Sequence, residues 1–140
     1  MSVSTVGWRR IEPSARTAVL AVGDLAAILL FVAAGEYQHG YNPLVDVGRV
    51  AGTFAPFLVG WVLMAGAAGL YATDATADLR RTLGVTLVSW ILAVVVAMGL
   101  RATAVFHGDA ALTFAVVSVL IGGTLLCLWR AAATLALSRF

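Results

Sequence analysis

Three residues that could do chemistry stand close together in an apolar part of the chain. Asp24 lies within the apolar stretch 18–40, and Glu36 and His39 follow near its end at a spacing of i, i+3. A carboxylate inside a membrane span is a candidate functional group as well as a structural one, so Asp24 is a candidate proton or ion relay. E-x-x-H is also the spacing of di-iron helical bundles, but those need two copies and further glutamates, and this chain has one copy.

The composition places the chain among integral membrane proteins. Of its 140 residues, 61% are hydrophobic and 11% are charged, whereas a soluble domain carries about 25% charged residues. The net charge of +2 and the scarcity of polar surface argue against a nucleic-acid-binding protein. All basic residues are arginines, and the lack of lysine excludes a retinal protein, a Schiff-base enzyme and a Walker A phosphate loop. Cys127 is the single cysteine, which excludes an internal disulfide and a CxxC motif.

Four stretches are long and apolar enough to cross a bilayer, which requires about 20 residues per helix. We expect these helices at about residues 17–35, 52–72, 83–100 and 110–129. Their short connections favour antiparallel neighbours, so the predicted fold class is an all-α, four-helix transmembrane bundle. It forms one domain over 17–140, preceded by a cytoplasmic, interfacial tail at 1–16. Pro56 lies near the start of the second helix, or marks a kink if that helix begins near Val47.

The arginines are distributed unevenly between the two ends of this predicted bundle. Seven fall at one end: Arg9, Arg10, Arg16, Arg80, Arg81, Arg130 and Arg139. The other two, Arg49 and Arg101, fall at the opposite end. Because cytoplasmic segments carry an excess of Lys and Arg, we predict that both termini are cytoplasmic and that this is a multi-pass protein of the cell membrane.

Asp24 needs a partner, since a charged aspartate at the centre of a membrane helix costs about 2.5–3.5 kcal/mol on insertion scales. We expect its side chain to face the bundle interior. The third helix carries Thr86 and Ser89 at a matching depth, and no arginine falls within a predicted span there, so their hydroxyls are the predicted partners. Asp24 is then either a structural residue whose hydrogen bonds hold neighbouring helices together or a relay group for protons or ions.

A second polar group belongs to the two connections on the outer side. We expect these residues to converge into one extracytoplasmic patch: Glu36, His39, Arg49, Arg101 and His107. The two histidines are candidate ligands for haem or a divalent metal, and the patch is a candidate site for a quinone headgroup or a substrate. Ordinary polar loop residues are the alternative interpretation.

Several short motifs resemble those of a known family. The chain looks like a member of an uncharacterised family. The motifs are an acid in the first helix (Asp24), a histidine after it (His39), "PF" opening the second helix (residues 56–57) and "GLR" ending the third (residues 99–101). That family consists of small four-helix membrane proteins from halophilic archaea and high-GC bacteria. The resemblance covers most of the chain and implies a fold but no activity. It favours Asp24, His39 and Arg101 as the residues to test.

Three functions of different classes follow from these residues. The first is proton- or ion-linked transport by an oligomer with Asp24 as the coupling acid, because four helices enclose little space. The second is a redox-associated subunit that holds haem or a quinone. The third is a structural or assembly subunit of a membrane complex, which docks through faces of small residues. No nucleophile with an adjacent base is visible, so we do not expect an enzyme. The expected partners are the lipid bilayer and either further copies of the chain or another membrane subunit.

Overall fold

The computed structural model describes residues 14–72, 78–103 and 111–137. Within them the chain is helical, and four helices are long and apolar enough to cross a membrane, which confirms the predicted fold class. The first three are α1 (Ala15–Gln38), α2 (Val47–Ala68) and α3 (Leu79–Arg101). The fourth is continuous over Leu112–Leu137 and consists of α4 (Leu112–Val117), a π-helical segment η2 (Ser118–Gly122) and α5 (Gly123–Leu137).

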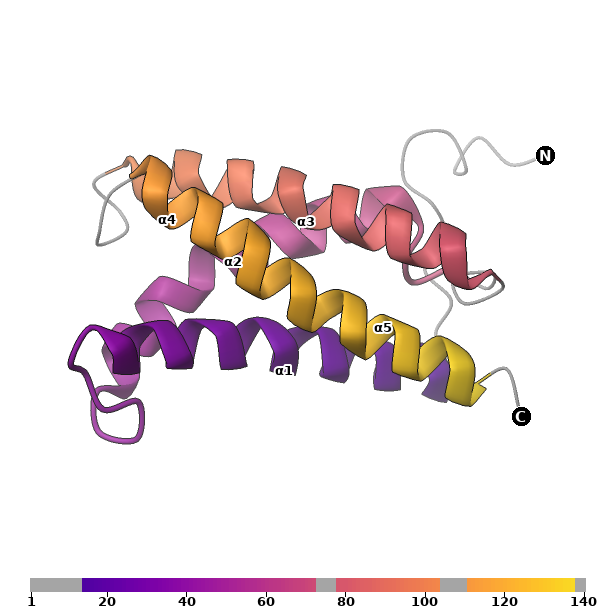
Figure 1. Ribbon diagram of the computed structural model, residues 1–140, viewed down its shortest axis with the longest axis horizontal. Helices are drawn as coiled ribbons and strands as arrows, with labels where there is room; N and C mark the ends of the chain where they lie inside the picture. The colour runs from indigo at the N-terminus through magenta and orange to yellow at the C-terminus, as the bar shows by residue number, and fades with distance from the viewer. Residues whose placement is uncertain (1–13, 73–77, 104–110, 138–140) are drawn as a thin grey trace.

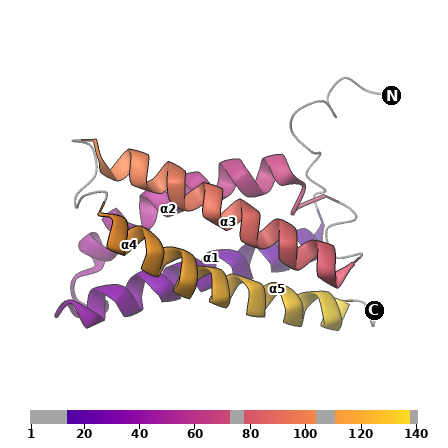
Figure 2. The same ribbon diagram turned by 45° about the horizontal axis from the view of Figure 1, so that its top comes forward.

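The four helices form an antiparallel bundle in which α1, α2, α3 and α5 each pack against two neighbours in a ring (Figure 1; Figure 2). The end of α1 and the start of α2 lie at one end of the bundle, together with the end of α3 and the start of α4 (Figure 1). We call this the outer end. The start of α1 and the end of α5 lie at the other, inner end, as the predicted topology requires. Which end faces the cytoplasm remains a prediction from the arginine distribution.

The second helix begins at Val47, five residues before the predicted start, and ends at Ala68. Pro56 therefore lies inside α2 rather than near its start, and its missing N–H interrupts the helical hydrogen bonds at the middle of the bundle. The helix ends earlier than predicted because Gly69 adopts the left-handed conformation with φ 85°. The Leu70 N–H then bonds the Ala65 carbonyl at 3.1 Å, which closes the helix with a Schellman turn.

Aromatic rings fill the centre of the bundle. Phe57 of α2 stacks on Trp90 of α3 at 5.6 Å between centroids and meets Phe31 of α1 edge-on at 5.5 Å. Phe114 of α4 closes this cluster on the outer side and Trp61 of α2 on the inner side. The Trp90 indole N–H donates to the carbonyl of Ser118, in the π-helical segment, at 2.8 Å. We call these five rings, Phe31, Phe57, Trp61, Trp90 and Phe114, the aromatic block.

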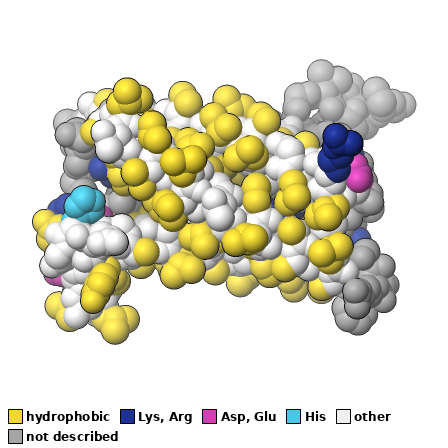
Figure 3. Space-filling view, viewed as in Figure 1, with side chains coloured by type: hydrophobic (Ala, Val, Ile, Leu, Met, Phe, Trp, Pro, Cys, Tyr) yellow, Lys and Arg dark blue, Asp and Glu magenta, His cyan; other side chains and the backbone are white. Residues whose placement is uncertain are grey.

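Glycine allows two of the helices to approach closely. A Cβ added to Gly60 of α2 would overlap the backbone carbonyl of Ala93 in α3. The bundle's outer surface is a broad apolar belt of exposed aliphatic side chains, and charged side chains gather toward its two ends (Figure 3). That distribution suits lipid around the middle and water or headgroups at both ends.

Candidate functional sites

The inner half of the bundle holds a buried ion pair between Asp24 of α1 and Arg130 of α5. Arg130 donates through Nε to Asp24 Oδ1 at 2.9 Å and through Nη2 to Asp24 Oδ2 at 2.6 Å. Both side chains are completely buried, at 0% exposure. This parallel, two-bond arrangement is the strongest pairing available to an arginine and a carboxylate.

Two aromatic residues extend this ion pair into a network. The Tyr71 hydroxyl donates to Asp24 Oδ2 at 2.5 Å, and the Trp61 indole N–H donates to the Tyr71 oxygen at 2.8 Å. Arg130 Nη1 donates to the Leu70 carbonyl at 3.0 Å. The left-handed turn at Gly69 positions both Leu70 and Tyr71, because it ends α2 directly before them. We call Asp24, Arg130, Tyr71 and Trp61 the inner network.

The predicted partners of Asp24 were wrong. Asp24 does face the bundle interior, but its hydrogen-bond partners are Arg130 and Tyr71, not Thr86 and Ser89. The hydroxyls of Thr86 and Ser89 are buried, yet neither has a hydrogen-bond partner within the described part of the chain. An arginine competes far better than a hydroxyl for a buried carboxylate, because it brings an opposite charge together with two donors.

The sequence does not predict Arg130 as a partner of Asp24, because the predicted fourth helix ends at residue 129 and leaves Arg130 outside it. The helix continues to Leu137, so Arg130 lies about two turns inside its inner end. The sequence contains a signal for this extension, since the apolar run "AAATLAL" at residues 131–137 follows Arg130 directly. Gly23 also contributes, because the ring of Trp129 occupies the space a Cβ would take there, which brings α5 close to α1 beside Asp24.

Replacing Tyr71 with phenylalanine should lower the free energy of unfolding at neutral pH by about 1.5–3 kcal/mol, the usual worth of a hydrogen bond to a charged group. Burial, together with the neighbouring Asp24 carboxylate, raises the pKa of Tyr71 above its ordinary value of 10.0. Above about pH 10 the unfolded chain therefore loses this proton while the folded chain retains it, so stability falls as the pH rises. The free energy of unfolding is measured in mixed micelles at pH 7 and pH 11. Between these two pH values it should fall less for Tyr71→Phe than for the parent protein, and an equal fall in both would contradict this account.

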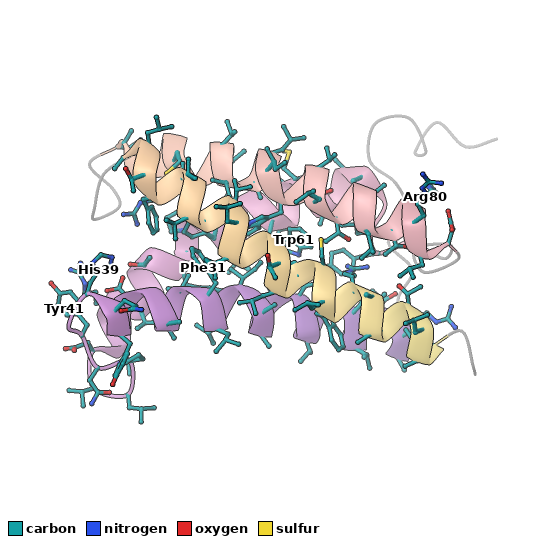
Figure 4. All side chains as sticks on the ribbon, in the orientation of Figure 1. Phe31, His39, Tyr41, Trp61 and Arg80 are labelled. Atoms are coloured by element: carbon teal, nitrogen blue, oxygen red, sulfur yellow. The ribbon has the colours of Figure 1, made fainter. Side chains whose placement is uncertain are left out.

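The outer end of the bundle contains a pocket of about 430 Å³. Its rim combines charged and polar side chains from α1, the α1–α2 connection, α2 and α3: Glu36, His39, Tyr41, Arg49, Thr53 and Arg101. Its floor is apolar and includes Phe31, Val32 and Phe114. His39 and Tyr41 lie together at this end, with Phe31 further inside and Arg80 at the opposite end of the molecule (Figure 4). We call this cavity the outer pocket.

The charged groups on the rim are held in fixed positions. Glu36 accepts from Arg49 Nε at 2.8 Å and from the Thr53 hydroxyl at 2.6 Å. The guanidinium of Arg49 also lies over the Tyr41 ring, 3.9 Å from its centroid. Arg101 is largely buried, and its guanidinium lies 4.4 Å from the centroid of the Phe114 ring. Thr53 and Tyr41 were not among the predicted site residues, since neither stands out in the sequence.

The structure brings Glu36, His39, Arg49 and Arg101 around one pocket, whereas His107 lies outside the described residues. A joint role of His39 and His107 in holding haem therefore stays a prediction. Among the residues described, no three histidine, cysteine, aspartate or glutamate side chains lie close enough together to hold a metal ion. The described lining of this pocket offers donors from arginine, tyrosine and histidine side chains above an apolar floor.

The bundle, its apolar belt and its two polar sites define the chain as a small four-helix integral membrane protein. Residues 21–133 match the family described as a protein of unknown function, DUF3054, and the chain belongs to that family. The membership agrees with the resemblance to an uncharacterised family of four-helix membrane proteins. No curated protein and no solved structure has significant similarity to the chain.

Proposed function

We propose that this protein binds a small solute in the outer pocket, and that this binding is the extracytoplasmic step of proton- or ion-linked transport by an oligomer. The pocket itself is the observation that carries the proposal. Its volume of about 430 Å³ lies within the roughly 300–1,000 Å³ that is usual for small-molecule sites. It also combines an apolar floor with a few fixed polar groups, which is the usual construction of such sites.

The arrangement of the two polar sites supports a transport role. Asp24 and Glu36 are 12 positions apart on α1, so the inner network and the outer pocket are separated by roughly 18 Å along the helix. The aromatic block lies between them and includes both floor rings of the pocket and Trp61 of the inner network. Pro56 and the π-helical segment interrupt regular hydrogen bonding beside this block. Such interruptions are frequent at hinges and functional sites.

An oligomer is part of the proposal because the interior of one copy is filled. The five rings of the aromatic block close the centre of the bundle, and Phe57, Trp61 and Trp90 are 0% exposed. A solute would pass either when these helices move apart or along a surface between two copies. In this scheme Asp24 would act as a coupling group by exchanging Arg130 for a proton during the cycle.

Binding of a quinone headgroup is a second candidate function. The rings of Phe31 and Phe114 both line the floor and lie 6.4 Å apart with an angle of 24° between their planes, so the floor is aromatic. Donors on the rim, from Arg49, Tyr41 and His39, could bond the carbonyl oxygens of a quinone. A soluble quinone is therefore included among the test solutes.

Solute binding can be tested by protection of an introduced thiol. In a Cys127→Ser background, His39→Cys places a reactive thiol on the rim, and its labelling rate with a small membrane-impermeant reagent is measured in proteoliposomes. Mixtures of organic anions, organic cations, neutral sugars and a short-chain quinone are added in turn. We expect at least one mixture to slow the labelling several-fold, because an occupied pocket excludes the reagent.

The matched control is Leu44→Cys in the same background. Leu44 is 89% exposed and belongs to the same connection between α1 and α2, but it does not line the pocket. Its labelling should be unaffected by every mixture. If no mixture protects His39→Cys, or if both thiols are protected equally, solute binding at the pocket is refuted. Proteoliposome counterflow with the protecting solute then tests transport separately from binding.

A further inference from the structure

We infer that the solute of the outer pocket is an amphipathic organic anion whose carboxylate binds the outer edge of Arg49 and whose apolar body rests on Phe31, Val32 and Phe114. This inference rests on the proposed solute binding and specifies its chemical class. It follows from which hydrogen-bonding groups on the rim are already used and which are left to a ligand.

The carboxylate of Glu36 is already occupied. One oxygen accepts from Thr53 at 2.6 Å and the other from Arg49 at 2.8 Å, and Glu36 is only 7% exposed. A cationic ligand would have to compete with the Arg49 guanidinium for a largely buried carboxylate. Breaking such a pair would leave a charge without its partner, which is unfavourable. Glu36 therefore acts as an anchor for Arg49 rather than as a site for cations.

Arg49 is held in a conformation that presents donors. Its Nε donates to Glu36, and its guanidinium carbon lies 3.9 Å from the centroid of the Tyr41 ring. The side chain remains 42% exposed. The two Nη nitrogens make no hydrogen bond or ion pair with another described residue. The edge formed by these two nitrogens matches the two oxygens of a carboxylate, and the guanidinium is already oriented before a ligand arrives.

The apolar floor requires a ligand with more than an anionic group. Phe31 and Val32 are buried, at 4% and 2% exposure, and with Phe114 they form the wall toward the aromatic block. Acetate or inorganic phosphate would leave this wall in contact with water. A ring or short alkyl chain would cover it, and the burial of its apolar surface adds to the affinity.

The ligand class can be tested with three probes of nearly the same shape. Benzoate, benzamide and benzamidinium carry the same ring with a negative, a neutral and a positive group, and acetate lacks the ring. Their dissociation constants are measured by calorimetry with the full chain in lipid nanodiscs. We expect benzoate to bind at least tenfold more tightly than benzamide, benzamidinium and acetate.

Two variants locate the effect at Arg49. Arg49→Gln should weaken benzoate binding at least tenfold and leave benzamide binding unchanged, which a general loss of folding would not do. Tyr41→Leu keeps the charge but removes the stacked ring, so it should weaken benzoate by a few fold. Arg80→Gln, at the opposite end of the molecule, is the matched control and should leave all dissociation constants unchanged (Figure 4).

The outcomes separate this inference from the proposed function. If benzamide or benzamidinium binds as tightly as benzoate, or if Arg49→Gln leaves benzoate binding intact, the carboxylate class is wrong. The carboxylate class is also wrong if benzoate does not bind while another mixture protects His39→Cys. In that case the proposed binding of a solute in the outer pocket is retained. If neither benzoate nor any mixture acts at the pocket, both proposals are overturned.

Discussion

Replacing Arg130 with methionine is expected to lower the free energy of unfolding by about 3–5 kcal/mol, the cost of leaving one member of a buried ion pair without its partner. Asp24 and Arg130 are both 0% exposed, so neither charge can reach water when the other is removed. Tyr71 would supply the remaining hydrogen bond to Asp24 and would not replace the lost positive charge. Asp24→Leu should cause a loss of similar size, because it leaves the guanidinium of Arg130 buried.

The double variant Asp24→Leu/Arg130→Met is expected to recover most of the lost stability. Apolar residues of similar volume often replace a buried ion pair without loss, since the desolvation of both charges is avoided. Reversible unfolding in mixed micelles gives the three free energies and hence the coupling between the two positions. A double variant as unstable as either single variant would mean that packing, not the charge pair, accounts for the losses.

The same variants address the predicted relay role of Asp24. The double variant is expected to keep the fold while it removes the titratable carboxylate, so a change in its activity would not result from unfolding. If it binds benzoate normally but no longer supports proton-linked uptake in proteoliposomes, Asp24 is a coupling group. If uptake is unchanged, the ion pair is structural, and transport proceeds without Asp24.

Replacing Gly60 with alanine should destabilise the bundle by about 1–3 kcal/mol, the usual cost of overpacking. The added Cβ would overlap the Ala93 carbonyl oxygen and lie 3.1 Å from its carbonyl carbon. Because the obstacle is backbone, no side chain can rotate away, and α2 and α3 must separate. Association of membrane helices depends on such close contact between small residues, so this separation is costly.

Gly48→Ala provides a control on the same helix. A Cβ at Gly48 would meet nothing within 4 Å, and Gly48 lies in the first turn of α2, so the change should be neutral or slightly stabilising. Both changes are measured by thermal unfolding in the same detergent. Equal effects at the two positions would contradict the close contact between α2 and α3. Separation of these helices should also weaken benzoate binding, since α2 carries Arg49 and Thr53 to the outer pocket.

The sequence by itself determined the elements of this protein and the direction in which its buried acid points. Hydrocarbon cannot hydrogen-bond the backbone, so apolar stretches of this length must become helices, and four were expected and found. An ionisable group in lipid is costly, so Asp24 had to face the interior with a partner. Residues of the two outer connections had to lie at one end, which brought Glu36, His39, Arg49 and Arg101 together.

Only the tertiary structure decided which residues meet. The periodicity of a helix reveals which face is polar, but the residue opposite that face depends on the rotation, depth and exact ends of the neighbouring helices. Arg130 is 106 positions from Asp24. It reaches the acid because α5 continues to Leu137, which keeps Arg130 within the helix, and because Trp129 packs against Gly23. Tyr71 joins them through the turn at Gly69. In the outer pocket the same limit applies, since the pairing of Glu36 with Arg49 and Thr53 results from how α1 and α2 pack, which local sequence does not encode.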